Sequence, residues 1–304
     1  MTTDRLIDAI LQKKNPTVLG LDPQPEHLPP EMIAEAAMEY GETLQALAIA
    51  AVRVNEILID ALHDIIPAVK LQLACYEQYG PAGMVIFAET IALAKAHGMY
   101  VIADGKRGDI GSTSAAYSAA YLGRVPFGNK LLPVYDTDAL TINPYLGSDN
   151  LAPFIKDCQE YDKMLFILCK TSNPSSFEVQ ELIAGDRPLY KVIADQVSRA
   201  GSKLVGSYGY SSLGIVAGAT QPSAIKALRQ NHPELFFLVP GYGMQGGKSD
   251  DIALAFGKYG RGAIVNNSRG ITCAWQKTGQ PIADAARQAA ISMRDDLRTH
   301  IVLL

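Results

Sequence analysis

The chain lacks both a long apolar run and an excess of positive charge. None of its apolar stretches approaches the roughly 18 residues that a membrane-spanning helix needs. Its 27 lysines and arginines are outnumbered by 31 aspartates and glutamates, for a net charge of -4. That balance argues against a broad nucleic-acid surface, although it leaves room for a local anion site. We therefore expect neither a membrane nor a nucleic acid as a partner.

Cysteine is scarce, and the spacings that mark common catalytic centres are missing. The four cysteines form no Cys-x-x-Cys pair, and the five histidines show no metal-ligand spacing. No Gly-x-Ser-x-Gly nucleophile turn is present. Residues 2–8 place acids inside an apolar pattern, which predicts a short amphipathic helix and not a signal peptide. We expect a cytoplasmic protein with reduced, buried thiols.

What the chain does contain is a regular alternation of short apolar runs and longer helical patterns. Hydrophobic residues make up 48% and charged residues 19%, a composition that supports a substantial core. The predicted strands are 17–21, 68–73, 100–103, 139–142, 164–169, 214–217, 235–239 and 263–265. The predicted helices are 43–63, 81–97, 112–122, 149–159, 189–201, 222–231, 248–256 and 281–297.

Strand followed by helix, repeated along the whole chain, predicts a single α/β domain over residues 1–304, a (β/α)8 TIM barrel. An open doubly wound sheet is the alternative, because periodicity does not prove that a sheet closes. The two loosest segments, 22–41 and 171–188, both follow predicted strands. In a barrel they would lie at the face where active sites are built.

A dense charge cluster follows the third predicted strand, in Asp104-Gly-Lys106-Arg-Gly-Asp109. Side chains alternate faces along a strand, so Asp104 and Lys106 are expected to point the same way. Lys70 interrupts the apolar second strand, where a lysine is costly unless it is paired or reaches a polar cavity. Lys70 either extends to the end of the barrel or joins an Asp–Lys network with this cluster.

Other polar residues follow the remaining predicted strands and should converge at one end of a barrel. They are Asp22, the run 170–173, and the run Asn266-Asn-Ser268-Arg269. The glycine-rich segment 241–247 contains Gly-x-Gly-x-x-Gly, but it follows the seventh strand instead of the first, so we discount a dinucleotide site. A glycine-rich turn before a helix can still present N–H groups to phosphate, with Arg269 as a partner; an ordinary flexible loop is the alternative.

These motifs resemble one enzyme family, orotidine 5′-phosphate decarboxylase, essentially from end to end. The segment from Asp104 to Thr113 is similar to the family signature Asp-x-Lys-x-x-Asp-Ile-x-x-Thr. Segments 19–23, 69–70, 169–174, 240–245 and 267–270 also fit the family's motifs. The chain length and the Thr-Ser-Asn-Pro loop resemble the longer bacterial subgroup, type 2.

The resemblance implies a homodimeric barrel that acts on orotidine 5′-phosphate with no cofactor and no metal. Lys106 would donate a proton to C6 of the pyrimidine, Asp104 would lie beside the substrate carboxylate, and Lys70 would bridge the carboxylates and the ribose. Asp109 and Thr113 would reach into the partner subunit's site. The resemblance also implies that Asp22 contacts a ribose hydroxyl, that Ser172 contacts the pyrimidine, and that Gln245 and Arg269 contact the 5′-phosphate. Ile110 is a further implied substrate-binding residue. Gln72 stands where relatives are expected to carry asparagine.

Two other functions fit part of this pattern. Sugar-phosphate synthases and decarboxylases of the same barrel group share Asp-x-Lys-x-x-Asp and use Mg²⁺ held by carboxylates. The long loop after the fifth strand and the context of Ser172 favour the pyrimidine enzyme. A non-catalytic sensor of a phosphorylated ligand is the third interpretation, since a fold does not fix a function. A sensor has no need of four costly buried charges, which argues against it.

Overall fold

Eight parallel strands close into a barrel in the computed structural model, which describes residues 1–243 and 246–304. Going round the barrel, the strand order is β1-β12-β11-β10-β7-β6-β3-β2. The strands are β1 (Thr17–Leu21), β2 (Ala68–Gln72), β3 (Tyr100–Arg107), β6 (Ala139–Ile142), β7 (Met164–Lys170), β10 (Leu213–Ala217), β11 (Phe237–Pro240) and β12 (Ala263–Asn267). Closure confirms the predicted barrel and excludes the open sheet.

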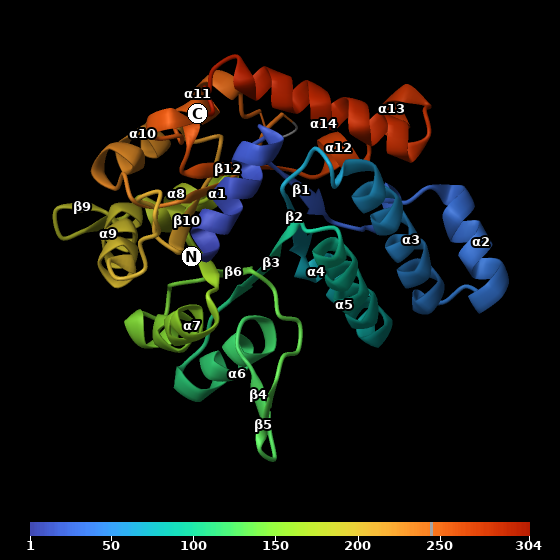
Figure 1. Ribbon diagram of the computed structural model, residues 1–304, viewed down its shortest axis with the longest axis horizontal. Helices are drawn as coiled ribbons and strands as arrows, with labels where there is room; N and C mark the ends of the chain where they lie inside the picture. The colour runs from blue at the N-terminus through green and yellow to red at the C-terminus, as the bar shows by residue number, and fades with distance from the viewer. Residues whose placement is uncertain (244–245) are drawn as a thin grey trace.

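Helices surround the barrel, as Figure 1 shows. The longer ones are α2 (Pro30–Tyr40), α3 (Leu44–Leu62), α5 (Gly80–Ala96), α6 (Gly111–Tyr121), α7 (Ser148–Tyr161), α9 (Leu189–Gly201), α10 (Pro222–Asn231) and α14 (Ile282–Arg298). Short elements are η1 (Pro25–His27), α4 (Leu73–Glu77), η2 (Pro174–Ser176), α8 (Phe177–Gln180), α11 (Ser249–Ala253), η3 (Lys258–Gly260), α12 (Arg269–Thr272) and α13 (Trp275–Thr278), with hairpins β4 (Val125–Phe127)–β5 (Lys130–Leu132) and β8 (Ile183–Ala184)–β9 (Arg187–Pro188). No helix in the described part of the chain has both the length and the apolarity to cross a membrane.

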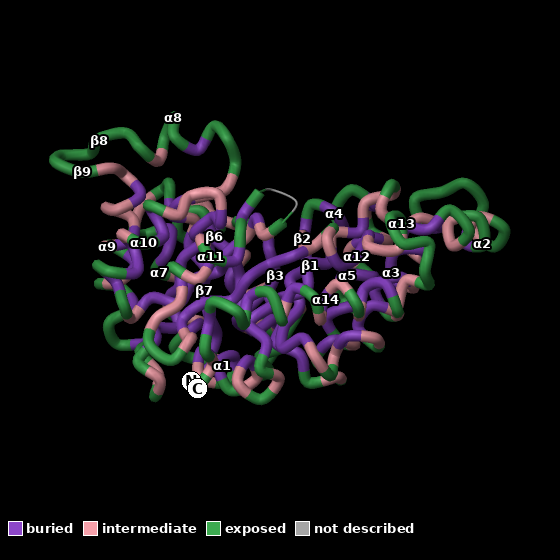
Figure 2. Tube along the Cα trace, turned by 90° about the horizontal axis from the view of Figure 1, so that it is seen from above, coloured by how far each residue is buried: buried purple, intermediate pink, exposed green. Residues whose placement is uncertain are grey.

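The predicted N-terminal amphipathic helix is α1 (Thr2–Lys13), and it closes one end of the barrel. Its apolar residues Leu6, Ile7 and Ile10 are buried against interior-facing strand residues such as Ile102 and Phe166. Figure 2 shows α1 on the face opposite the α8–β9 segment. One end of the barrel is therefore filled with apolar side chains, and the other end is left for polar ones.

Helix α2 lies in segment 22–41, for which the sequence pattern predicted no regular structure. Pro30 occupies the first helical position, where its fixed φ suits a helix and its missing N–H is not needed. Ala36 is the one residue of α2 that is fully buried. An apolar stripe this thin explains why hydrophobic periodicity missed the helix.

Strand β3 is longer than predicted, and its pairing is irregular. Ala103 pairs with Leu140 of β6, but the next pairing joins Arg107 to Ile142. Residues 104–106 therefore bulge opposite the single residue Thr141. Bulges of this kind re-aim side chains and are common beside active sites.

Candidate active site

The bulge in β3 brings the carboxylate of Asp104 and the ammonium of Lys106 together. Lys106 has a left-handed backbone, with a φ of 47°. Thr141 supports the turn, because its Oγ1 accepts a hydrogen bond from the Lys106 N–H at 2.9 Å and donates one to Asp104 Oδ1 at 2.8 Å. Strand alternation predicted that Asp104 and Lys106 point the same way; in the structure a bulge, and not simple alternation, brings the two side chains together.

Asp104 lies between two lysines. Its Oδ1 is 2.7 Å from Lys106 Nζ, and its Oδ2 is 2.6 Å from Lys70 Nζ. Gln72 Nε2 donates a further hydrogen bond to Asp104 Oδ2 at 3.2 Å, and Asp22 Oδ1 lies 4.0 Å from Lys70 Nζ. The structure thus joins Lys70 to the charge cluster instead of leaving it extended toward solvent.

Electrostatics hold Asp104 and Lys70 ionised. Burial alone would raise the pKa of Asp104, but the charges of Lys70 and Lys106 outweigh it and hold that pKa well below its ordinary value. Burial alone would lower the pKa of Lys70, but Asp104 and then Asp22 outweigh it and raise that pKa. The carboxylate and the Lys70 ammonium are therefore fixed charges at neutral pH.

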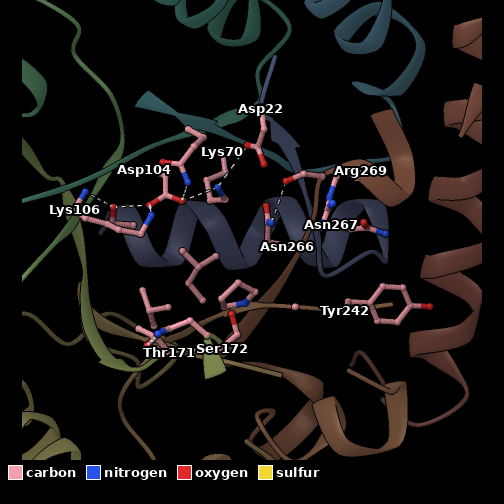
Figure 3. Close-up of a pocket in the computed structure, with 18 of the residues that line it drawn as sticks. Asp22, Lys70, Asp104, Lys106, Thr171, Ser172, Tyr242, Asn266, Asn267 and Arg269 are labelled. Carbon is pink, nitrogen blue, oxygen red and sulfur yellow. Dashed lines mark hydrogen bonds and ion pairs between the residues drawn. The ribbon is translucent and has the colours of Figure 1, made fainter. Parts of the chain in front are cut away.

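These charges line a cavity of about 630 Å³ at the carboxyl end of the barrel. Figure 3 shows the labelled side chains around it. Six of the residues expected in the site line this cavity: Asp22, Lys70, Asp104, Lys106, Ser172 and Arg269. Gln245 lies outside the described residues.

Asp109, Ile110 and Thr113 do not line the cavity among the residues described there. Asp109 Oδ1 accepts a hydrogen bond from the N–H of Ile110 at 2.7 Å, and Ile110 is 63% exposed. Thr113 is also exposed, in the first turn of α6. Within one chain, the second half of the signature therefore lies outside the cavity that Asp104 and Lys106 line.

Ser172 is held on the segment after β7 by several contacts. A side chain at Gly218 would come within 2.7 Å of the Ser172 backbone, so glycine is what allows the close approach. Ser172 O accepts a hydrogen bond from Thr220 Oγ1 at 3.2 Å. Just before Ser172, the Nζ of the buried Lys170 lies 2.9 Å from Glu181 Oε1. This ion pair joins the end of β7 to the segment that follows it.

Sequence reasoning missed several polar residues of the cavity. Thr141 supports the bulge, and Gln180 Oε1 accepts a hydrogen bond from the Thr171 N–H at 2.9 Å. His27 Nδ1 lies 3.1 Å from the carbonyl oxygen of Asp22. A polar residue inside the otherwise apolar run Ala139–Ile142 was a usable signal for Thr141, whereas Gln180 and His27 carry none.

The described residues hold no group of three or more His, Cys, Asp or Glu side chains placed to bind a metal ion. The four cysteines are free and buried. Among the ionisable groups that line the cavity, Asp22, Lys70, Asp104 and Lys106 are joined by ion pairs; the others are Glu26, His27, Tyr242 and Arg269.

A closed parallel barrel with an Asp–Lys network at its carboxyl end defines a (β/α)8 enzyme that acts on a small anionic molecule. The family model described as "Orotidine 5'-phosphate decarboxylase / HUMPS family" matches residues 19–280. The chain belongs to this family.

Individual relatives agree over nearly the whole chain. An orotidine 5′-phosphate decarboxylase of Caldicellulosiruptor bescii is 39% identical over 274 residues, covering 90% of each chain. One from Rhodopirellula baltica is 39% identical over 302 residues, covering 95% of this chain and 96% of the relative. The solved structure of Leishmania donovani OMP decarboxylase superimposes with a TM-score of 0.74, at 30% identity and 99% coverage of both chains.

Proposed function

We propose that this chain is a carboxy-lyase that converts orotidine 5′-phosphate to uridine 5′-phosphate and CO2, the last step of pyrimidine nucleotide synthesis. Family membership and relatives at up to 39% identity support this substrate. The observation that carries the proposal is the carboxylate of Asp104, fixed between the ammonium groups of Lys70 and Lys106 at the edge of a cavity.

The chemistry requires such a network. Loss of CO2 from C6 leaves a carbanion whose lone pair lies in the ring plane, where the π-system stabilises it poorly. Fixed charges must then supply most of the stabilisation. Lys106 Nζ would stabilise the developing charge at C6 and then deliver its proton there. Asp104 would lie beside the departing carboxylate and raise the energy of the bound substrate.

The remaining cavity residues would bind the parts of the substrate that do not react. Lys70 and Asp22 would contact the ribose, Ser172 the pyrimidine, and Arg269 with Gln245 the 5′-phosphate. Binding of the phosphate, far from the reacting carbon, would supply remote binding energy that serves the reaction. We propose that this network works without a metal or cofactor.

We also propose that the protein is a homodimer with sites shared across the interface. Asp109, Ile110 and Thr113 would complete the partner's site, which fits their position outside the cavity of their own chain. The hairpin β4–β5 follows α6 directly and exposes Phe127 and Leu131, and Figure 1 shows it projecting from the barrel. Exposed apolar side chains of this kind are typical of an interface.

Two further proposals concern the chain as a whole. We propose that residues 1–304 work as one domain, because the barrel uses strands from both ends of the chain. We also propose a cytoplasmic location, supported by free, buried cysteines that suit a reducing compartment.

The direct test is the change in absorbance of orotidine 5′-phosphate incubated with the purified protein in the presence of a chelator. We expect uridine 5′-phosphate as product and a rate that the chelator does not reduce. A Lys106→Ala preparation made in parallel controls for contaminating enzyme. Absence of turnover would overturn the proposal, and turnover that disappears with the chelator would favour the Mg²⁺-dependent enzymes of the same barrel group.

A further inference from the structure

Asn266 is a polar residue of the cavity to which the proposed function assigns no task. It lies on β12, two positions after the interior-facing Ile264, so it faces the inside of the barrel. The residue is only 9% exposed and lines the cavity. Its Nδ2 donates a hydrogen bond to Ser268 Oγ at 3.3 Å. Its Oδ1 is buried and has no hydrogen-bond partner within the described chain.

A second buried acceptor without a hydrogen bond lies close by. Asp22 Oδ1 also lacks a hydrogen-bond partner in the described structure, and its nearest cation is Lys70 Nζ at 4.0 Å. A buried acceptor left unpaired costs about 1–3 kcal/mol. The cavity therefore carries two oxygens that a bound ligand could satisfy together.

The position of Asn266 Oδ1 relative to Asp22 follows from Gly20. A side chain at Gly20 would collide with Ser268 Oγ, and its Cβ would lie 2.9 Å from Asn266 Oδ1. The amide oxygen therefore lies directly over the backbone of β1 at Gly20. Asp22 comes two residues later on the same face, which puts the two positions about 6.6 Å apart along the strand. Figure 3 shows Asp22, Lys70 and Asn266 around this part of the cavity.

The chemistry of these atoms restricts the ligand group. Both oxygens are acceptors, so a phosphate or carbonyl oxygen cannot satisfy them. A cationic group would be repelled by Lys70, which already lies beside Asp22. Neutral donors remain, either N–H or O–H groups, and the sugar of a nucleotide offers two O–H groups on adjacent carbons. Adjacent sugar hydroxyls, each donating a hydrogen bond of about 2.8 Å, can reach two acceptors held at neighbouring positions along one strand.

We propose that Asn266 Oδ1 accepts a hydrogen bond from a sugar hydroxyl of the substrate, next to the hydroxyl that Asp22 binds. Together the two residues select a ribonucleotide over its deoxy counterparts. The inference rests on the proposed function, because it assumes a nucleotide in this cavity. It adds Asn266 to the residues that determine specificity.

The test compares the affinities of three ligands for the wild type and for Asn266→Ala. The ligands are uridine 5′-phosphate, its 2′-deoxy form and its 3′-deoxy form, measured by calorimetry. We expect Asn266→Ala to weaken the binding of uridine 5′-phosphate about tenfold. We expect one of the deoxy nucleotides to bind equally well to both proteins, because the hydroxyl that Asn266 contacts is already missing.

Asn267→Ala is the matched control. Its amide Nδ2 lies 3.5 Å from Met293 Sδ of α14, and its Oδ1 accepts a hydrogen bond from the Gly270 N–H at 3.1 Å. Because Asn267 supports α12, which begins at Arg269, its loss should weaken the binding of all three ligands by one common factor. If Asn266→Ala lowers the unfolding midpoint, Asn266→Leu, which keeps the volume without a polar atom, is measured in the same way.

Two results would overturn the inference while leaving the proposed function intact. One is that the Asn266 variant binds all three ligands as the wild type does. The other is that the Asn266 variant weakens the binding of all three ligands by a common factor, as expected for Asn267→Ala. If the wild type neither binds uridine 5′-phosphate nor turns over orotidine 5′-phosphate, the proposed function fails and the inference fails with it.

Discussion

At the residue scale, the site depends on one carboxylate with two ammonium partners. Asp104 accepts from Lys70 at one oxygen and from Lys106 at the other. Lys70 is 4% exposed, whereas the Lys106 side chain is 44% exposed and borders the cavity. Lys70 is thus the more deeply buried partner of Asp104, and Lys106 is the ammonium that is more open to a substrate, although both line the cavity.

Lys106→Ala tests the proton donor. We expect turnover to fall about a thousandfold or more, because the variant loses both the charge at C6 and the proton. Binding of uridine 5′-phosphate should change much less, and the unfolding midpoint should confirm a folded barrel. Alanine at the exposed Lys203 is the control. Near-normal turnover in Lys106→Ala would assign the proton to another group.

Asp104→Asn tests the network through stability and its dependence on pH. The substitution leaves the buried Lys70 without its main partner, which should lower the free energy of unfolding by about 3 kcal/mol near pH 7. The remaining burial then depresses the pKa of Lys70 below its unfolded value, so stability should rise as pH increases through that folded pKa toward about 10.4.

The wild type should behave differently in the same pH range. Its Lys70 pKa is raised, so the stability that this ion pair contributes is present below about pH 10.4 and is lost above it. The pKa of Asp104 is depressed, so its contribution is present above about pH 3.9 and is lost as pH falls toward the folded pKa. Denaturant titrations across pH measure both effects, and parallel curves for the two proteins would contradict the coupling.

Residue types at strand ends could be predicted from the sequence, but their partners could not. Lys70 and Asp104 stood out because charges inside apolar runs are costly. The task of Thr141 depends on its pairing opposite a bulge, which periodicity does not encode. Asp22 and Asn266 line the same cavity because β1 and β12 pair across the closure of the barrel.

At the scale of elements, α1 fills the end of the barrel opposite the site. Leu6→Ala should lower the free energy of unfolding by about 2–4 kcal/mol, because Leu6 is fully buried and leaves a cavity. KM and kcat at permissive temperature should stay near wild type, since α1 does not line the site cavity. Met38→Ala, at a position 84% exposed on α2, is the control and should change stability by less than about 0.5 kcal/mol.

Most elements could be predicted because their apolar periodicity is strong. The strands, buried on both faces, are nearly continuous apolar runs, and α9 and α10 begin and end at the predicted residues. The glycine-rich segment before α11 gave a weaker signal, and α11 is shorter than predicted. The hairpins β4–β5 and β8–β9 were missed because their strands are only two or three residues long.

At the scale of the whole molecule, the proposed dimer makes each site depend on two chains. Lys106→Ala and Asp109→Ala should each be inactive alone. Hybrid dimers produced by co-expression would contain one intact site, with Lys106 from one chain and Asp109 from the other. A random mixture should recover about a quarter of wild-type activity.

Two measurements sharpen this complementation test. Glutamate at both Phe127 and Leu131 should disrupt the exposed hairpin surface, give monomers by light scattering, and abolish activity with Lys106 and Asp104 intact. Should co-expression recover no activity although mixed dimers are isolated, the sites are not shared.

The left-handed backbone at Lys106 lowers the stability of the fold at the position of the proposed proton donor. A non-glycine residue with this φ costs about 1 kcal/mol. Lys106→Gly should therefore be more stable than Lys106→Ala by about that amount, reversing the usual order within a strand, and thermal unfolding of the two variants measures it. A library of uncharged residues at position 106, selected only for survival of heating, should drift toward glycine. Because none of these uncharged residues carries an ammonium proton, heat selection would rank the variants by backbone fit alone, and turnover would need a separate screen.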